Sequence, residues 1–301
     1  MSEPLVSICM ITYNHAPFIA DAIQGIVSQK TNFPIELVIG EDCSTDNTRE
    51  IIEQYQKIYP SIIRLLPNSK NLGVMKNFYR TLNACSGKYI ALCEGDDYWT
   101  DPLKLQKQVD FLESHTDYSL CFHNAMVHYE DGKTSDRPFG EIEDRDYTGV
   151  EIYEKWAIPT ASVVLRKDVV KSELYTKVSK EKRFVYGDIV LFLTASKCGK
   201  IHGFPEIMSI YRKHSGGVVF QEKLSRKSFQ HDIALGELFG QKIKTTTKKV
   251  LAKKYFVYCS QQTKKHCYKE AVWAAFKSIK TSPAIFCKLA YNIYLSQLWK
   301  H

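Results

Sequence analysis

The chain has 301 residues, a formal net charge of +8 and an apolar fraction of 44%. This length suffices for one large α/β domain with an appendage. The sequence contains no run of about 18 apolar residues, so we expect no membrane-spanning helix. The nine cysteines form no CxxC pair and the N-terminus lacks the apolar core of a signal peptide, so we expect reduced thiols in a cytoplasmic protein, without a disulfide framework.

The positive charge is concentrated near the C-terminus. Residues 221–301 hold 16 basic and 4 acidic residues, whereas residues 1–220 hold 25 and 29. We therefore expect two parts, a larger domain over 1–220 and a basic helical region over 221–301. A cationic region of this kind suits an anionic membrane surface, a nucleic acid or a charged polymer, and it is equally typical of a solvated helical face.

Apolar runs typical of buried strands alternate with segments of helical periodicity over the first 130 residues. The predicted strands are 5–12, 35–40, 62–66, 89–93 and 118–129. The predicted helices are 16–29, 45–59, 74–85 and 102–114. Strands alternating with helices of this length indicate an α/β fold with a mostly parallel, Rossmann-like sheet flanked by helices.

The pattern loosens after residue 130. Residues 131–146 are polar and predict a loop, 160–165 predict a strand and 189–196 predict a helix. From about residue 222 the lysine-rich sequence predicts a series of helices, which form a C-terminal helical extension.

Polar clusters follow three of the predicted strands. They are 12–14, 41–46 and 94–97, the last of which reads E-G-D-D. Because ligands of open α/β sheets bind beyond the carboxyl ends of the strands, these clusters could line one crevice. Their carboxylates could accept hydrogen bonds from a nucleoside or hold a divalent ion against a diphosphate. A solvated acidic turn is the alternative for the Asp-Asp pair.

Several motifs in order resemble a family 2 glycosyltransferase of GT-A fold. They are V-S-I-C-M-I-T-Y-N, E-D-C-S-T-D-N-T, N-x-G at 71–73, G-K-Y-I-A-L and E-G-D-D-Y-W, and the resemblance spans about residues 5–217. It implies transfer of a sugar from a nucleotide donor.

The resemblance implies a nucleotide site made of Thr12, Tyr13, Asn14, Glu41, Asp42 and Asp96. Tyr13 resembles the aromatic residue that stacks on the base. Asp42 resembles the acid at the base edge, with Glu41 in place of the commoner Asp beside it. Asp96 matches the acid that meets the ribose.

The family's metal motif falls on the same acidic run. The resemblance implies that Asp97, as the last acid of the DXD motif, holds Mg²⁺ or Mn²⁺ on the donor diphosphate. His214, in Y-R-K-H, is implied as a metal ligand or a diphosphate contact, and Arg212 as a counter-charge to phosphate. Glu94 stands where the first acid of the motif is expected, and this departure leaves its role open.

The implied general base is Asp188, in V-Y-G-D, which would deprotonate the acceptor hydroxyl. Capping of the following helix is the alternative for this residue. Trp99 and the loop around 159–161 are candidates for the acceptor side, and packing in the core is the alternative for Trp99.

We therefore expect a metal-dependent inverting glycosyltransferase that moves a sugar from a nucleotide-diphosphate donor, expected to be a UDP-sugar, to a hydroxyl of a glycan or lipid-linked acceptor. Surface polysaccharide synthesis is expected by analogy only. One alternative is a non-catalytic sugar-nucleotide binder, which would have lost Asp97 or Asp188. Another is a nucleotidyltransferase, which typically has a Gly-rich phosphate loop where this chain has 13–17. The basic region has no nucleic-acid motif, so we expect no nucleic-acid partner.

The last segment, 282–301, is apolar with few charges. We expect it either to lie in the interface of a membrane, as a peripheral contact, or to pack on the catalytic domain or on a second subunit. The residues concerned are Ile285, Leu289, Ile293 and Leu298, with Phe286, Tyr294 and Trp299.

Overall fold

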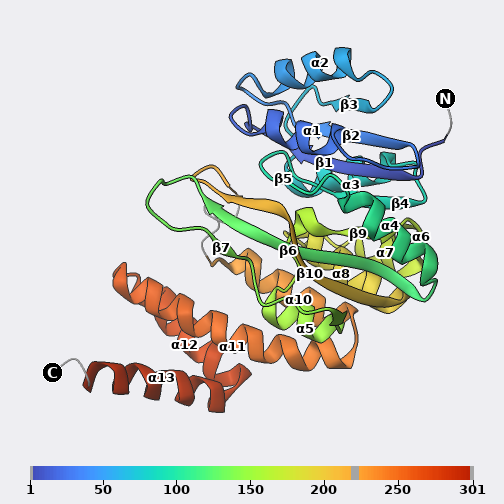
Figure 1. The fold of residues 1–301 in the computed structure, drawn as a ribbon. Coiled ribbons are helices and arrows are strands. Elements are labelled where there is room, and N and C mark those ends of the chain that lie inside the picture. The colour runs from blue at the N-terminus through green and yellow to red at the C-terminus, as the bar shows by residue number, and fades with distance from the viewer. Residues whose placement is uncertain (1–2, 218–223, 299–301) are drawn as a thin grey trace. The chain divides into compact units, whose positions relative to one another are not determined.

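The computed structural model describes residues 3–217 and 224–298 (Figure 1). The chain forms two compact units. The first comprises Met1–Lys180 and Tyr186–Gln221, and the second comprises Glu181–Val185 and Glu222–His301.

The first unit is built on one mixed sheet with the strand order β3-β2-β1-β4-β9-β6-β10-β5. Its strands are β1 (Val6–Thr12), β2 (Ile35–Glu41), β3 (Ile63–Pro67), β4 (Tyr89–Leu92), β5 (Tyr98–Trp99), β6 (Tyr118–Tyr129), β7 (Arg137–Pro138), β8 (Arg145–Asp146), β9 (Val164–Arg166) and β10 (Lys200–Lys213). Strands β3, β2, β1 and β4 are parallel to one another, as are β6 and β10, and the antiparallel β9 joins these two blocks. The predicted α/β class with a mostly parallel central sheet is confirmed.

Helices connect the strands of the first unit. They are α1 (Ile19–Val27), α2 (Thr48–Ile58), α3 (Val74–Ala84), α4 (Lys104–Ser114), α5 (Gly149–Lys155), the 3₁₀ turn η1 (Thr160–Ser162), α6 (Asp168–Lys171), α7 (Glu173–Val178) and α8 (Gly187–Cys198). The helix predicted at 189–196 is therefore confirmed and is longer than expected.

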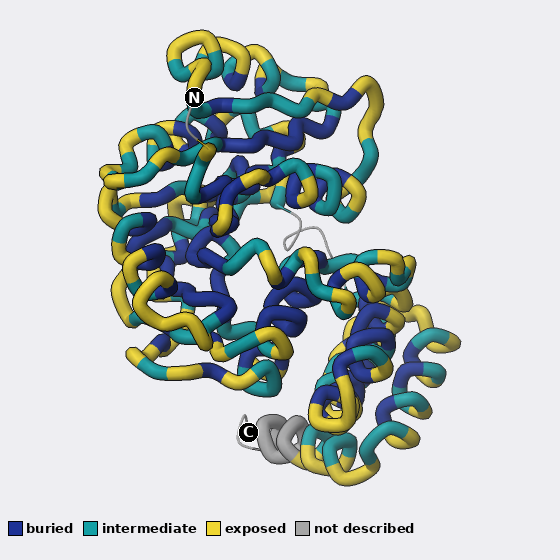
Figure 2. Tube along the Cα trace, turned by 90° about the vertical axis from the view of Figure 1, so that its right-hand side faces the viewer, coloured by how far each residue is buried: buried dark blue, intermediate teal, exposed yellow. Residues whose placement is uncertain are grey.

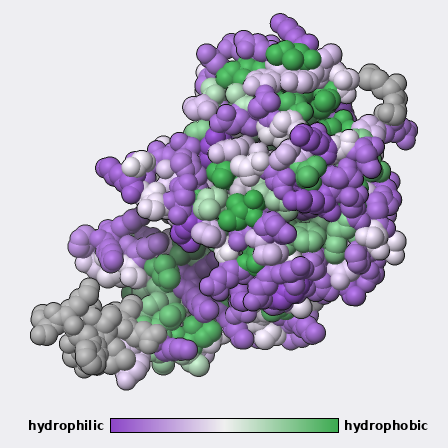
Figure 3. Space-filling model, viewed as in Figure 1, coloured by the Kyte–Doolittle hydropathy of each residue, from purple (hydrophilic) through white to green (hydrophobic). Residues whose placement is uncertain are grey.

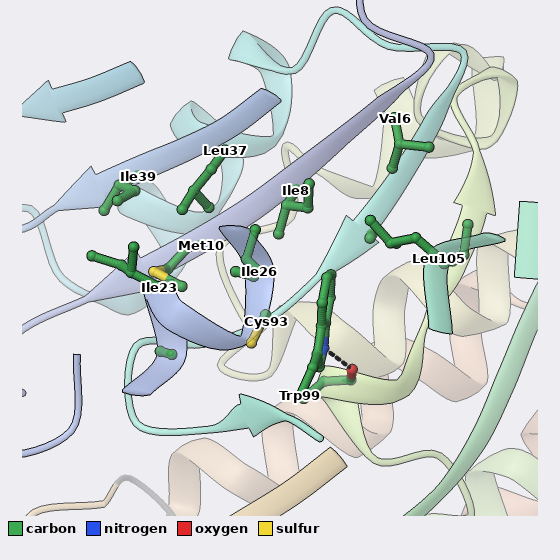
Figure 4. Packing of buried hydrophobic residues seen from close by; sticks show 14 of the residues in the cluster. Val6, Ile8, Met10, Ile23, Ile26, Leu37, Ile39, Cys93, Trp99 and Leu105 are labelled. Carbon is green, nitrogen blue, oxygen red and sulfur yellow. Dashed lines mark hydrogen bonds between the residues drawn. The ribbon is translucent and has the colours of Figure 1, made fainter. Parts of the chain in front are cut away.

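The core lies between the central strands and the helices on them. Ile8 and Met10 of β1 pack with residues of β2 and with Ile23 and Ile26 of α1, all fully buried (Figure 4). Burial of such side chains is the main favourable term in folding. Helix α1 lies very close to β5, since a Cβ on Gly25 would stand 2.7 Å from the carbonyl oxygen of Trp99. Figure 2 shows the central strands mostly in the colour of buried residues.

Two predicted segments differ from the structure. Residues 131–146 are mostly a loop, but β7 and β8 lie within them and pair with β6 and β10. Residues 160–165 begin as the 3₁₀ turn η1 instead of a strand. Ser162 donates through its backbone N–H and its Oγ to the carbonyl of Pro159, which closes this turn, and β9 starts only at Val164.

The second unit contains the helices α10 (Arg226–Leu238), α11 (Gln241–Lys264), α12 (Tyr268–Thr281) and α13 (Pro283–Leu298), as the lysine-rich sequence predicted. Its small core includes Phe229, Leu251 and Tyr255. The rings of Phe256 and Phe286 lie 5.4 Å apart, so the first part of the segment 282–301 packs within its own unit. Trp299 and the side chains of Ile293, Tyr294 and Leu298 lie outside the described residues. Among the described residues, no helix has both the length and the apolar character needed to cross a bilayer.

Candidate active site

The loops after β1 and β2 are fastened to each other. The backbone N–H of Asn14 donates to Ser44 Oγ (3.0 Å), and Asn14 Oδ1 accepts from the backbone N–H of Thr45 (2.8 Å). Asn14 has φ +56°, a left-handed conformation that asparagine tolerates well. The turn leaves Tyr13 42% exposed beside these loops, which suits an aromatic side chain that stacks on a ligand.

Glu41 and Asp42, both predicted to contact the nucleotide, accept hydrogen bonds from other residues of the protein. Glu41 is fully buried and its carboxylate accepts from Arg49 Nε (2.6 Å). Asp42 is 3% exposed and accepts from the backbone N–H groups of Leu72 (2.8 Å) and Gly73 (2.9 Å). In this structure both carboxylates position loops, because burial and these donors leave little surface for a ligand.

The acidic run after β4 lies against the end of β1. A Cβ on Gly95 would stand 2.6 Å from Thr12 Oγ1, so glycine is required for this close approach. The approach brings Asp96 beside two histidines. His214 Nε2 lies 3.1 Å from Asp96 Oδ2, and His15 Nε2 lies 3.8 Å from the same oxygen.

His15, Asp96 and His214 could hold a metal ion. One ligand atom from each residue lies within 4.8 Å of the others. Burial alone would raise the pKa of Asp96, but the neighbouring His15 and His214 lower it overall. His214 was predicted as a metal ligand. His15 was not, although it directly follows the T-Y-N motif, because a lone histidine carries no ligand spacing by which it could be recognised.

Asp97, the other predicted metal ligand, is not in this set. It is 1% exposed, and its Oδ1 accepts from the backbone N–H of Arg212 (2.9 Å). Its Oδ2 is buried without a hydrogen-bond partner among the described residues. Burial, together with the nearby Asp96 and Glu94, holds the pKa of Asp97 well above its ordinary value.

Arg212 is a clamp on the acidic loop. Its guanidinium contacts Asp21 of α1 (2.5 Å) and Glu130 after β6 (3.1 Å), and it donates to the carbonyl of Asp96 (3.2 Å). The same group lies over the ring of Tyr98, 4.3 Å from its centroid. In this structure its charge is paired within the protein, and the role as a counter-charge to phosphate stays a prediction.

Replacing Arg212 with glutamine should lower the free energy of unfolding by about 3 kcal/mol, the lower end of the cost of breaking a buried ion pair. The value lies at that end because Asp21, once unpaired, is 60% exposed and can be hydrated. Urea denaturation followed by circular dichroism measures this. Lys213→Gln, at the next position of β10, should change the stability by no more than about 0.5 kcal/mol. An Arg212→Gln variant as stable as the wild type would show that the guanidinium is free for a ligand.

Asp188 lies in the first turn of α8. Its Oδ1 accepts from the backbone N–H of Ile189 (2.8 Å) and its Oδ2 from Thr160 Oγ1 (3.3 Å). Tyr186, and not Asp188, is the N-cap residue, but Asp188 accepts from an N–H of the first turn and so also stabilises the start of α8. Burial raises the pKa of Asp188, which makes the carboxylate a stronger base.

The carboxylates of the acidic run after β4 and the carboxylate of Asp188 in α8 act on one another. Burial first, and then the nearby Asp96 and Asp188, raise the pKa of Glu94 to about 8. Burial first, and then the nearby Asp97 and Glu94, raise the pKa of Tyr211 of β10. Thr12 Oγ1 and His15 Nδ1 are also buried without a hydrogen-bond partner among the described residues. Such unpaired groups are costly and mark a site shaped for a ligand or cation.

Trp99 does not face this cluster. It is 3% exposed, its Nε1 donates to the carbonyl of Ala161 (2.7 Å), and Lys104 Nζ lies 4.0 Å from its ring centroid. Figure 4 shows its side chain among the buried hydrophobic residues of the core. Packing, the alternative for this residue, is what the structure shows.

The chain is similar to several known proteins. An uncharacterised protein of Mycobacterium bovis is 38% identical over 225 residues, which cover 74% of this chain and 63% of that protein, so the match spans less than two thirds of the relative's length. TuaG of Bacillus subtilis, whose name places it among the glycosyltransferases of teichuronic acid biosynthesis, is 35% identical over 137 residues (45% of this chain, 52% of TuaG).

The fold is shared with a solved structure, that of Staphylococcus aureus TarS 1–349 in complex with UDP-GlcNAc. The two align with a TM-score of 0.69 and 16% identity, covering 93% of this chain and 82% of TarS 1–349. The model of the family named Glycosyl transferase family 2 matches residues 7–172, more than half of the chain. The chain therefore belongs to glycosyltransferase family 2 and has a GT-A fold.

Proposed function

We propose that this glycosyltransferase moves a sugar from a nucleotide-diphosphate donor to an acceptor hydroxyl with inversion at the anomeric carbon. The observation that carries the proposal is the pair of sites at one end of the sheet. His15, Asp96 and His214 form a possible cation site, and Asp188, which is close enough to raise the pKa of Glu94, provides a separate carboxylate base. A leaving diphosphate needs a cation and an attacking alcohol needs a base, so the two sites have complementary tasks.

The donor is proposed to be a UDP-sugar. Tyr13, which is 42% exposed, is the residue that we expect to stack on the nucleobase. The loops beside it are hydrogen-bonded to each other, which would hold the binding surface for the nucleobase in place. The similarity of fold to TarS bound to UDP-GlcNAc supports this choice of nucleotide.

The donor set fits a divalent cation. A carboxylate and two imidazoles surround a common point, and the unpaired Nδ1 of His15 and Oδ2 of Asp97 nearby could bind water in its outer sphere. Mg²⁺ prefers oxygen ligands, whereas imidazole suits first-row transition metals, so the set favours Mn²⁺ over Mg²⁺. When bound, the cation would neutralise the developing charge on the departing diphosphate. Asp96 is then the metal-binding acid, in place of Asp97.

Asp188 is proposed as the general base. Its two neighbours, the backbone N–H of Ile189 and Thr160 Oγ1, hold the carboxylate in place, and burial strengthens it as a base. A single base and a single displacement invert the configuration of the transferred sugar. A product with the anomeric configuration of the donor, seen by NMR, would contradict this part of the proposal.

The acceptor is proposed to be a glycan or a lipid-linked sugar in surface polysaccharide synthesis. The support is the relationship to TuaG, whose name assigns it to such a polymer. Of the two candidates named from the sequence for the acceptor side, Trp99 lies in the core, whereas the loop around 159–161 carries Thr160, whose Oγ1 donates to the proposed base Asp188.

A thermal-shift panel of nucleotide sugars with Mn²⁺ tests the proposal. A donor present at about 100 times its Kd should stabilise the protein by about 2.7 kcal/mol. UDP-sugars should raise the Tm, and removal of Mn²⁺ should abolish the rise. Stabilisation without release of UDP in the presence of acceptor would indicate a non-catalytic binder. Pyrophosphate release from a nucleoside triphosphate and a sugar phosphate would indicate a nucleotidyltransferase.

A further inference from the structure

Helix α12 carries four large apolar side chains on its exposed side. Tyr268, Val272, Phe276 and Ile279 are 60%, 69%, 61% and 43% exposed, and their spacing of four, four and three residues places them along one face of the helix. These four residues are called the α12 stripe below. Figure 3 shows apolar surface over the C-terminal helices.

The opposite side of α12 is what holds the helix in its unit. Small residues there, Ala271, Ala274 and Ser278, are buried, and Ser278 Oγ donates to the carbonyl of Ala252 in α11 (2.8 Å). An amphipathic helix usually turns its large apolar groups inward. Trp273 of α12 does so and packs in the small core of its unit, but the four residues of the α12 stripe are left outside, and an exposed row of this kind marks a binding surface.

The charge around the stripe identifies its partner. Residues 241–281, which include α11 and α12, contain 11 lysines and a single acid, Glu270. Glu270 is paired with Arg226 (2.8 Å), and among the residues that the structure describes Lys254, bound to Asp232, is the only one of these lysines in an ion pair. Nine of the 11 lysines are exposed.

Two of the exposed lysines border the stripe. Lys269 precedes Val272 by three residues and Lys280 follows Phe276 by four, so both lie along the same side of the helix as these apolar groups. A second copy of this chain would bring its own lysines against these and be repelled. A charged polymer would meet the lysines but leave the apolar groups in water. A bilayer with anionic headgroups matches both features.

We propose that the α12 stripe, with Lys269 and Lys280, is a docking surface for an anionic phospholipid bilayer. The apolar side chains enter the boundary between headgroups and acyl chains, and the lysines meet lipid phosphates. This surface lies on α12, whereas the sequence had directed attention to 282–301, whose described first part packs on α11. It is independent of the sugar-transfer chemistry, so a protein without transferase activity would still bind.

Flotation of the full chain with vesicles tests the proposal. Binding is expected to vesicles of phosphatidylcholine with phosphatidylglycerol, to be weakened by salt, and to be much weaker with phosphatidylcholine alone. Val272→Ser with Phe276→Ser should lower the partition coefficient about tenfold or more. Ile58→Ser, at an equally exposed position (66%) on α2, is the matched control and should bind as the wild type.

The charge contribution has its own pair of variants. Lys269→Gln with Lys280→Gln should lower the partition coefficient at low salt about 25-fold, since one lysine near an anionic surface is worth about 1 kcal/mol, or fivefold. Lys57→Gln, exposed on α2, is the control. Circular dichroism establishes that each variant is folded. Failure of the full chain to float with anionic vesicles, or unchanged flotation of the folded α12 variants, overturns the proposal. A wild-type dimer that the α12 substitutions convert to a monomer also overturns it, in favour of a second copy.

Discussion

Replacing Asp188 with asparagine should lower kcat by about 10²–10⁴-fold, the usual contribution of a general base. The amide keeps the size of the side chain and one oxygen for the N–H of Ile189, but it cannot take a proton. Donor affinity, measured by calorimetry with Mn²⁺ present, should stay unchanged because the group acts on the acceptor. A collapse of donor affinity together with kcat would instead make Asp188 a donor-site or folding residue.

The pH profile gives a second measure of the same residue. The carboxylate works in its deprotonated form, so the rate of transfer falls as the pH drops through the pKa of Asp188. Because burial raises that pKa, the fall should occur at a higher pH than for an ordinary aspartate. In Asp188→Asn this fall of the rate at low pH, the acidic limb of the profile, should disappear. Asp168→Asn is the matched control, because Asp168 is an exposed acid in the first turn of α6, and it should retain both the rate and the limb.

Asp96→Asn should remove Mn²⁺ binding and lower kcat/KM by about 10²–10³-fold, the usual cost of losing one stabilising contact to developing charge. The substitution deletes the only carboxylate among the three possible ligands and leaves two imidazoles. Binding of Mn²⁺ can be followed directly by electron paramagnetic resonance, which needs no turnover. Excess EDTA should abolish activity of the wild type.

Comparing Asp97→Asn with Asp96→Asn tests which of the two acids binds the metal. Asp97 Oδ1 accepts from the N–H of Arg212, which an amide oxygen also does, so Mn²⁺ binding should persist in Asp97→Asn. The sequence resemblance implied that Asp97 holds the metal, whereas we propose Asp96 because it lies in the possible cation site with His15 and His214. Loss of Mn²⁺ binding in Asp97→Asn with retention in Asp96→Asn would restore the assignment made from the sequence.

The sequence predicted the parallel half of the fold because its strands are continuous apolar runs. Strands β1, β2 and β4 are buried on both faces and begin and end within two residues of their predicted bounds. β10 was not predicted along its length. It contains Gly203 and Pro205, which argue locally against a strand, and its pairing with β6 slips in register between Phe204 and Ile207, next to that proline. Only pairing with a distant strand makes this segment extended.

The sequence indicated which residues lie near the candidate site better than it indicated what each of them does. The resemblance named Asp96, Asp188 and His214, and of these only Asp96 was also indicated by the argument from strand ends. The motifs could not show that Arg49 and Leu72 supply partners for Glu41 and Asp42, because those donors come from other parts of the chain. The contribution of His15 depends on a turn that brings it beside Asp96, a feature that no local pattern encodes.

The Arg212 clamp also has a consequence for the order in which the domain folds. The groups that it joins, Asp21, Asp96 and Glu130, are all synthesised before it, and β5 finds its partner only in Ser209 and Ile210 of β10. Pairings between such distant segments are slow to form, since loop closure must precede the contacts that reward it. A nascent chain that ends before residue 212 therefore lacks the guanidinium that joins these groups, and we expect the proposed cation site to be completed among the last events of folding.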